Sequence, residues 1–185
     1  MKNYNKQDFP VSEIRRFLEP GPVVLVSSAY KGETNIMTMG WHTVMEFSPS
    51  LIGCMITSAN YSYDLIKDSG ECVINIPEVH MATTVVGIGN CSGSDVNKFE
   101  KFNLTAEEAT MVKAPLIAEC YAHFECKIHD AQMLDKYNFF IFEVVKAHVA
   151  ISPKYPETIH YRGEGHFMVS GNAVSYRDKF LPQNL

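Results

Sequence analysis

The stretch TNIMTMGWHTVMEFSPSLIGCMIT, residues 34–57, contains the pattern that decides the fold. Apolar and polar residues alternate along it, as they do in β-strands that have one buried face. Ser48-Pro49-Ser50 divides the stretch as a turn would, so the pattern predicts one strand over residues 34–47 and another over 51–57. A plain strand pair does not explain why an amide, a hydroxyl, a glycine and the only tryptophan interrupt it: Asn35, Thr38, Gly40 and Trp41.

Composition limits the classes of protein to which the chain can belong. Its 185 residues are 46% hydrophobic and 20% charged, which predicts one folded domain over residues 1–185 with a substantial core. The net charge of −5, without a Lys/Arg cluster, argues against nucleic acid as a partner. The sequence contains neither a run of roughly 20 apolar residues that would span a bilayer nor an apolar signal segment at its start. We therefore expect a cytoplasmic protein with no membrane partner.

The remaining sequence predicts many strands and a few short helices. Strands are expected over residues 22–29, 72–77, 121–133 and 138–151, because β-branched residues or strict alternation run through them. A helix is expected over residues 62–69, with Ser62 as its N-cap and Gly70 after its last turn, and Ser94 is expected to cap another. The strands 22–29, 34–47 and 51–57 would form a meander. The fold class is thus mainly β with short helices, a β-barrel with helical insertions.

Polar residues crowd the start of the predicted helix, from Thr57 to Tyr63. A helix N-terminus offers unpaired N–H groups and the positive end of the helix dipole, which suit a phosphate. The hydroxyls of Thr57, Ser58 and Ser62 would add donors. The alternative is an ordinary loop in which Ser62 only caps its helix.

The residues from Asn35 to Trp41 suggest a second half of the same site. In a strand, Thr38 and Gly40 face one way, and a glycine inside a strand often marks the close approach of a ligand or of another backbone. The alternative is a β-bulge with Trp41 in the core. Strand pairing would bring Thr57 near Asn35. A phosphate-binding site beside a flat surface is what a mononucleotide such as FMN requires.

Histidines and cysteines do not form a predicted metal site. His123 and His129 share a strand face but lie about 20 Å apart at roughly 3.3 Å per residue, and no Cys or carboxylate completes a zinc set around His160 and His166. The five cysteines form no CxxC pair and are interpreted as reduced, buried thiols.

Taken together, these segments resemble a known family. NIMTMGWHTVMEFSPSLIGCMIT, the following NYSYDLIKDSGECVINIP, Cys91-Ser92-Gly93 with Lys98, and the later HYRG are similar to the flavin reductase-like domain. That domain is the FMN-binding split barrel of flavoredoxins and flavin:NAD(P)H reductases, and the form NIMTMGWH resembles flavoredoxin more than the reductases of two-component monooxygenases. The resemblance implies a Greek-key-like, homodimeric split β-barrel with a core over residues 22–150. It also implies a C-terminal tail, residues 151–185, that completes an FMN site at or near the subunit interface.

The resemblance also implies which residues bind the cofactor. The phosphate and ribityl chain would lie near Lys98 and the start of the predicted helix, and the isoalloxazine edge would meet the backbone of residues 38–41 and 54–56. Two positions depart from the family: many relatives have Ser in place of Gly40 and a smaller residue in place of Tyr63. The full cofactor set is Asn35, Thr38, Met39, Gly40, Trp41, Cys54, Met55, Ile56, Thr57, Ser58, Asn60, Ser62, Tyr63, Ser92, Lys98, Tyr161 and Phe167.

The expected chemistry belongs largely to FMN, with NADH or NADPH as a transient hydride donor. No GxGxxG motif opens a βαβ unit, so a dinucleotide would not be held in a Rossmann fold. His160 is the candidate catalytic acid because imidazole titrates near neutrality, and a surface or structural histidine is the alternative. Three functions stay open: an NAD(P)H-dependent flavin reductase, an electron carrier that works with a redox protein partner, and a non-catalytic ligand-binding barrel.

Overall fold

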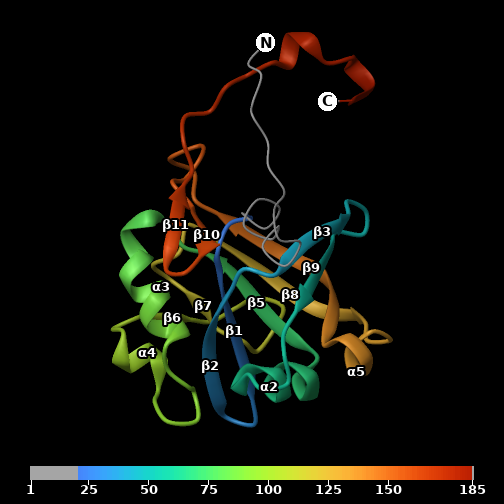
Figure 1. Ribbon diagram of the computed structural model, residues 1–185. Coiled ribbons are helices and arrows are strands. Elements are labelled where there is room, and N and C mark those ends of the chain that lie inside the picture. The colour runs from blue at the N-terminus through green and yellow to red at the C-terminus, as the bar shows by residue number, and fades with distance from the viewer. Residues whose placement is uncertain (1–20, 185) are drawn as a thin grey trace, which may run out of the picture.

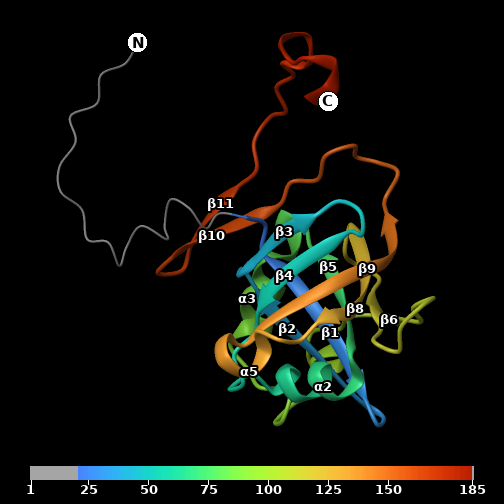
Figure 2. The same ribbon diagram turned by 90° about the vertical axis from the view of Figure 1, so that its right-hand side faces the viewer.

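The computed structural model describes residues 21–184, and its central feature is an antiparallel sheet that curls into a barrel (Figures 1 and 2). Within this range the sheet has seven strands in the order β2-β1-β5-β8-β9-β4-β3. The strands are β1 Val24–Tyr30, β2 Glu33–Met39, β3 His42–Glu46, β4 Leu51–Met55, β5 Glu71–Ile76, β8 Ala122–Asp130 and β9 Phe139–Val149.

The two edge strands of this sheet, β2 and β3, are consecutive in the chain. Only Gly40 and Trp41 join them, so the sheet must curl until its two edges approach each other. The N–H of Met55 donates to the carbonyl of Trp41 at 3.0 Å, which extends the β3–β4 pairing to the junction. The result is a barrel that is split along the free edge of β2.

The predicted continuous strand over residues 34–47 is therefore wrong. β2 pairs with β1, whereas β3 pairs with β4 at the opposite edge of the sheet. The chain changes partner at Gly40-Trp41, and alternation along a sequence cannot reveal a change of partner because both strands keep the same period. The predicted three-strand meander is wrong for the same reason: the structure has two separate hairpins.

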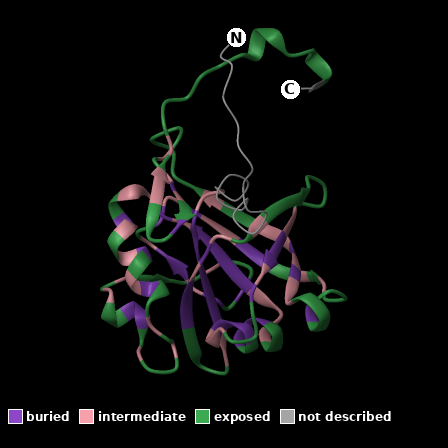
Figure 3. Cartoon of the chain, in the orientation of Figure 1, coloured by how far each residue is buried: buried purple, intermediate pink, exposed green. Residues whose placement is uncertain are grey.

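The barrel interior is filled by alternate residues of the strands. On β1, Val24 and Val26 face inward, whereas the intervening Leu25 packs outward, so this strand is buried on both faces (Figure 3). Helix α2, Tyr61–Ser69, adds Tyr63 and Ile66 to the interior cluster. Other members of this cluster are Met37, Met39, Cys54, Cys72, Cys126, Phe140 and Phe142.

A second layer covers the outer face of β1 and β2. It comprises η2 (Val79–Met81), α3 (Ala82–Gly89) and α4 (Lys98–Lys101), which lie along one side of the barrel in Figure 1. Val85 and Ile88 of α3 pack with Leu25 and Ile36 of the sheet. The remaining short elements are β6 Ala106–Glu107, β7 Leu116–Ile117, α5 Leu134–Tyr137, β10 Ile159–Gly163, β11 His166–Val169, η3 Arg177–Lys179 and η4 Pro182–Asn184.

The helix boundaries confirm one predicted signal and correct two. Gly70 follows α2 in the left-handed conformation, with φ 76°, as predicted. Asn60, not Ser62, occupies the N-cap position of α2, and Ser62 is buried inside the first turn. Asn97, not Ser94, caps α4, since its side chain accepts hydrogen bonds from Phe99 N and Glu100 N.

All five cysteines are free thiols, and four of them are buried as predicted, whereas Cys91 is only half-buried. Burial raises the pKa of the Cys120 thiol to about 12, so it stays protonated at neutral pH. Within residues 21–184 no helix is long and apolar enough to cross a bilayer. The predictions for residues 1–20, including the lack of a signal segment, lie outside the described residues.

Candidate functional site

The functional candidate is a groove along the free edge of β2, which we call the β2 groove. It consists of three adjoining hollows of about 500, 270 and 470 Å³. Thr38, Gly40 and Trp41 line both the first and the second, and Met37 and Asn60 line both the second and the third. β2 has a neighbouring strand on one side only in the described sheet, so its other edge presents backbone N–H and C=O groups without strand partners.

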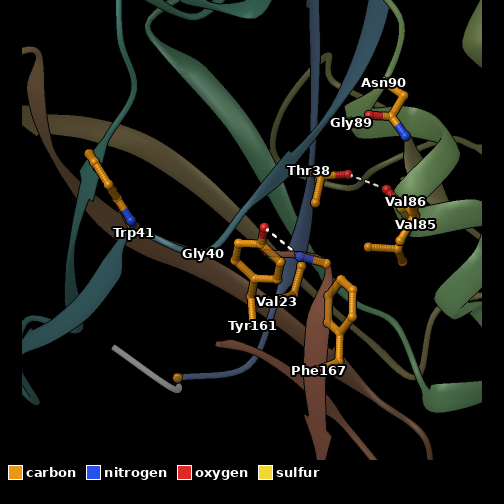
Figure 4. A pocket seen from close by; sticks show the side chains of 12 residues that line it. Val23, Thr38, Gly40, Trp41, Val85, Val86, Gly89, Asn90, Tyr161 and Phe167 are labelled. Atoms are coloured by element: carbon orange, nitrogen blue, oxygen red, sulfur yellow. Dashed lines mark hydrogen bonds between the residues drawn. The ribbon is translucent and has the colours of Figure 1, made fainter. Parts of the chain in front are cut away.

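The largest of these three hollows forms the apolar end of the groove (Figure 4). It lies between β2, α3 and the β10–β11 hairpin, where the rings of Tyr161 and Phe167 are 5.1 Å apart between centroids. The Oγ1 of Thr38 donates to the carbonyl of Val85 at 2.7 Å, which fastens α3 to β2. No carboxylate, imidazole, ammonium or guanidinium group lines this end in the part of the chain that the structure describes; its lining is Gly21, Val23, Thr38, Gly40, Trp41, Val85, Val86, Gly89, Asn90, Tyr161, Gly165 and Phe167.

The opposite, polar end lies where β2, the start of α2 and the loop after α3 meet. Its lining includes Asn60, Asn90, Ser92 and Lys98. Lys98 is only 5% exposed, and its Nζ donates to the carbonyl of Ile88 at 3.0 Å. Burial lowers the pKa of this ammonium below its usual 10.5. One main-chain carbonyl leaves the other N–H donors of a buried ammonium available to an anion.

Asn35 is the most unusual polar group at this end. It is 3% exposed, and its Nδ2 donates to the Oγ of Ser62 at 2.9 Å. Its Oδ1 is buried without a hydrogen-bond partner among the described residues. Buried polar atoms are nearly always paired, so an unpaired acceptor beside a polar hollow indicates that a donor from a ligand belongs there.

Two glycines in the β2 groove serve different purposes. A β-carbon at Gly93 would lie 2.2 Å from Asn35 Oδ1 and 2.7 Å from a ring carbon of Tyr61, so glycine allows this loop to approach Asn35. A β-carbon at Gly40 would meet no atom within 4 Å. The absence of a side chain at Gly40 therefore leaves open space in the groove and is not required by packing.

The structure gathers most of the predicted cofactor residues along this groove. The apolar end contains Thr38, Gly40, Trp41, Tyr161 and Phe167, and the polar end contains Asn35, Asn60, Ser92 and Lys98. The hollow between them is lined by Met39, Met55 and Thr57.

Five predicted cofactor residues do not line the groove. Cys54, Ile56 and Tyr63 belong to the barrel interior, where burial raises the pKa of the Cys54 thiol far above its usual 9.0. Ser62 is fully buried, and its Oγ accepts hydrogen bonds from Asn35 Nδ2 and Ser28 Oγ. Ser58 is exposed and lies outside the three hollows. For Cys54 and Ile56 the expectation concerned the backbone, which the inward direction of their side chains does not test. For Ser58, Ser62 and Tyr63, turn and helix geometry directs the side chains away from the groove.

His160, the predicted catalytic acid, also lies outside the groove. Its neighbour Tyr161 on β10 points into the apolar end, and successive residues of a strand face opposite sides. The Nε2 of His160 is 2.8 Å from the Oγ1 of Thr158. This placement favours the alternative interpretation of His160 as a structural histidine.

Sequence reasoning missed the contribution of α3. Val85, Val86, Gly89 and Asn90 line the groove, yet their sequence gives only an apolar helix broken by glycines. No spacing in the sequence distinguishes Gly89, which faces the groove, from Gly87, whose β-carbon would clash with Phe102 at 2.6 Å. Only the docking of α3 on β2 separates the two.

Comparison with known proteins supports the architecture. Residues 15–167 match the model of the flavin reductase like domain. An uncharacterized protein from Archaeoglobus fulgidus is 33% identical over 135 residues, which is 73% of this chain and 76% of that protein. The uncharacterized protein YddH of Escherichia coli is 28% identical over 174 residues, covering 86% of this chain and 92% of that protein.

Solved structures share the fold. The flavoredoxin from Methanosarcina acetivorans superposes with a TM-score of 0.80 at 20% identity and covers 98% of this chain and 100% of its own. An FMN-binding domain of a flavin reductases-like enzyme from Shewanella baltica gives a TM-score of 0.76 at 25% identity, with 90% and 95% covered. The split barrel, the β2 groove and the family match agree, and this chain belongs to the flavin reductase-like domain family.

Proposed function

We propose that this protein binds FMN in the β2 groove and uses it for electron transfer as an oxidoreductase. The observation that carries the proposal is the contrast between the two ends of the groove. An uncharged, aromatic-walled hollow is joined to a polar hollow that holds a buried ammonium and a buried, unpaired amide oxygen. This order matches a ligand in which a flat heteroaromatic ring is linked through a hydroxylated chain to a phosphate, with the ring in the apolar hollow and the phosphate in the polar one.

The apolar end fits the isoalloxazine ring. Tyr161, Phe167 and the valines of α3 supply flat and aliphatic walls, and aromatic side chains favour stacked contacts with planar rings. The free edge of β2 supplies backbone N–H and C=O groups for the polar edge of such a ring. Open space at Gly40 leaves room for the ring against the backbone.

The polar end fits the ribityl phosphate. The Asn35 Oδ1 would accept a hydrogen bond from a ribityl hydroxyl, and the Lys98 ammonium would bind the phosphate as a charge-assisted donor. Asn60 makes no side-chain capping bond at α2, and its carbonyl accepts the N–H of Tyr63 at 2.9 Å. The N–H groups of Tyr61 and Ser62 are therefore the phosphate donors that the first turn offers. Asn35 lies on a barrel strand, and Lys98 and the start of α2 lie on helices that pack against the barrel, so the position of each group is fixed.

FMN, when bound, supplies the acceptance and release of electrons. The chain supplies binding, orientation and exclusion of water: Tyr161 and Phe167 cover one side of the apolar end, and Trp41 stands at its rim. No side chain that titrates near neutral pH lines that end in the described residues. The proposed mechanism therefore assigns no acid–base step to the protein there.

Two sources of electrons are distinguishable. The first is NADH or NADPH, with the protein as a flavin reductase. The second is a redox protein partner, with the protein as a flavoredoxin-like carrier. The described apolar end has no cationic side chain to pair with the phosphates of NADH or NADPH, and this favours the carrier.

An anaerobic absorption experiment tests the proposal. The purified protein is titrated with FMN, passed through a desalting column, and then mixed with NADH or with NADPH. Retained flavin bands that bleach on mixing would identify a reductase, and retained bands that do not bleach would identify the carrier. A protein that takes up no FMN would overturn the proposal.

Gly40→Val provides the sharpest variant test, because a β-carbon at this position contacts nothing in the protein. We expect unchanged thermal stability without FMN and at least a tenfold weaker affinity for both FMN and riboflavin. Equal flavin affinity in the variant and the parent would show that the ring does not reach Gly40. Gly171→Val, at a glycine that is also unhindered and lies outside the groove, is the matched control.

A further inference from the structure

Cys91, in the loop after α3, differs from the other cysteines in its access to solvent. Cys54, Cys72, Cys120 and Cys126 are buried, whereas Cys91 is half-buried and lines the polar end of the β2 groove. A buried thiol is inert because reagents do not reach it and because burial disfavours the thiolate, which is the form that reacts. Among the described cysteines, Cys91 is therefore the one that a dissolved reagent can reach.

The Cys91 thiol lies beside a positive charge. Its Sγ donates to the carbonyl of Gly87 at 3.5 Å and to that of Ile88 at 3.8 Å, and the Nζ of Lys98 donates to the same Ile88 carbonyl at 3.0 Å. Thiol and ammonium thus meet at one oxygen atom. Burial lowers the pKa of Lys98, and the ionised form of Cys91 opposes this effect, as a neighbouring negative charge does. Partial exposure next to a lysine is typical of a reactive cysteine.

The hollow that Cys91 lines also has an unmet need for a ligand. Asn35 lines the same hollow and is 3% exposed, and its Oδ1 has no hydrogen-bond partner among the described residues. Buried acceptors are nearly always paired, so a group that enters this hollow should bring a donor. The described lining contains the Lys98 ammonium and no carboxylate, which favours an anionic group. A molecule that fits around Cys91 is therefore small, anionic and equipped with N–H donors.

We propose that Cys91 is an S-thiolation site, where a low-molecular-weight disulfide of the glutathione class forms a mixed disulfide that closes the polar end of the groove. Glutathione has carboxylates to pair with Lys98 and amide N–H groups to pair with the Asn35 Oδ1.

The reaction at Cys91 is thiol–disulfide exchange. Cys91 releases its proton to water, and its Sγ attacks one sulfur of the small disulfide. The new Sγ–S bond forms as the old S–S bond breaks, and the other half of the disulfide leaves as a thiolate. Cys91 is oxidised and the leaving half is reduced, so an excess of a reducing thiol reverses the step.

For flavin, the adduct acts as a competitor, a consequence that rests on the proposed function. The ribityl phosphate and the adduct need the same hollow of about 470 Å³ and the same Lys98 ammonium. Exclusion between two bound groups is reciprocal, so the adduct should keep FMN out and bound FMN should protect Cys91. The flavin-free protein then responds to the thiol–disulfide balance of its surroundings, whereas the loaded protein does not.

Thiol counting on the native full chain without FMN tests the site. With excess dithionitrobenzoate, an anionic aromatic disulfide, we expect one thiol per chain to react at least roughly tenfold faster than the others, and peptide mapping should place the adduct on Cys91. Cys91→Ser should abolish the fast reaction, and Cys120→Ala, which removes a buried thiol, should leave it unchanged. A protein without a fast thiol, or a fast adduct mapped to another cysteine, would overturn the proposal.

FMN titration measures the consequence of the adduct. The parent chain is treated with oxidised glutathione, desalted, and titrated with FMN before and after reduction with dithiothreitol. The adduct should weaken FMN affinity at least roughly tenfold, and reduction should restore it. The FMN affinity of Cys91→Ser should be the same before and after this treatment. A parent chain that carries the adduct and keeps its untreated affinity for FMN would contradict the closing of the groove.

Protection in the reverse direction separates this inference from the proposed function. FMN should slow the reaction of Cys91 with oxidised glutathione, and inorganic phosphate, which fits the polar end alone, should slow it as well. A protein that binds FMN without protecting Cys91 contradicts this inference alone. A protein that takes up no FMN contradicts the proposed function alone if phosphate still protects Cys91, and contradicts both if phosphate does not.

Discussion

The barrel interior and the β2 groove are built partly from the same strand, yet they differ in how completely they are filled. Met37 and Met39 of β2 help to fill the interior, where Phe140 and Phe142 stack at 5.4 Å between centroids. The groove holds an unpaired amide oxygen at Asn35, open space at Gly40 and a buried ammonium at Lys98. The chain fills the interior with its own side chains, whereas it leaves space and an unpaired polar atom in the groove.

The largest effect on stability is expected from the interior. Phe140→Ala removes a fully buried ring that contacts Tyr63 and Phe142 and should lower the free energy of unfolding by about 3–5 kcal/mol. Urea denaturation measures this loss, and the folded fraction should keep its affinity for FMN. A loss below about 1 kcal/mol would show that the barrel tolerates cavities and would weaken the contrast with the groove.

Gly93→Ala changes the polar end of the groove and should weaken both folding and FMN binding. The new methyl group must displace Asn35 or Tyr61, and such overpacking costs about 1–3 kcal/mol, or roughly 5- to 150-fold in affinity when it falls on the bound state. Calorimetric titration with FMN measures the change.

Gly87→Ala is the matched control for this variant. It places a methyl group 2.6 Å from a ring carbon of Phe102, so it overpacks the fold in a similar way, but it lies outside the three hollows and should leave FMN affinity unchanged. If Gly93→Ala also kept full FMN affinity, the polar end would not be the place where the ribityl phosphate binds.

Lys98→Met distinguishes the two ends of the groove. Loss of the ammonium should weaken FMN by about 1.5–3 kcal/mol, the range for hydrogen bonds to charged groups, and should leave riboflavin nearly unchanged because it has no phosphate. Lys101→Met, on the same short helix but with an exposed side chain, should alter neither affinity. Equal weakening of FMN and riboflavin would remove Lys98 from the phosphate site.

The pH dependence of FMN binding provides the finest test. Burial lowers the pKa of Lys98 below 10.5, and only the protonated form attracts a phosphate. The preference for FMN over riboflavin should therefore decline as pH rises through the lowered pKa of Lys98, at a lower pH than an ordinary lysine would give. In Lys98→Met the ratio should stay flat between pH 7 and 10; a parallel decline in both proteins would assign the titration to another group.

Local sequence patterns predicted most of the strands, the end of α2 and the segments that form the candidate groove. Alternation predicted the strands, the glycine after residue 69 predicted the end of α2, and polar residues at 35–41 and 57–63 predicted two sides of one site. These signals are local, because periodicity and capping depend on neighbouring residues. The family resemblance joined them into a split barrel, which the fold confirms.

Tertiary packing sets which side chains line the groove. The chain changes strand partner at Gly40-Trp41 so that the barrel can close, α3 docks on β2 through Thr38 and Val85, and Gly93 meets Asn35. The side chain of Tyr63, a residue that the resemblance placed at the cofactor, faces the interior. Pairing, closure and docking depend on contacts between residues far apart in the chain, and local patterns carry no record of those contacts.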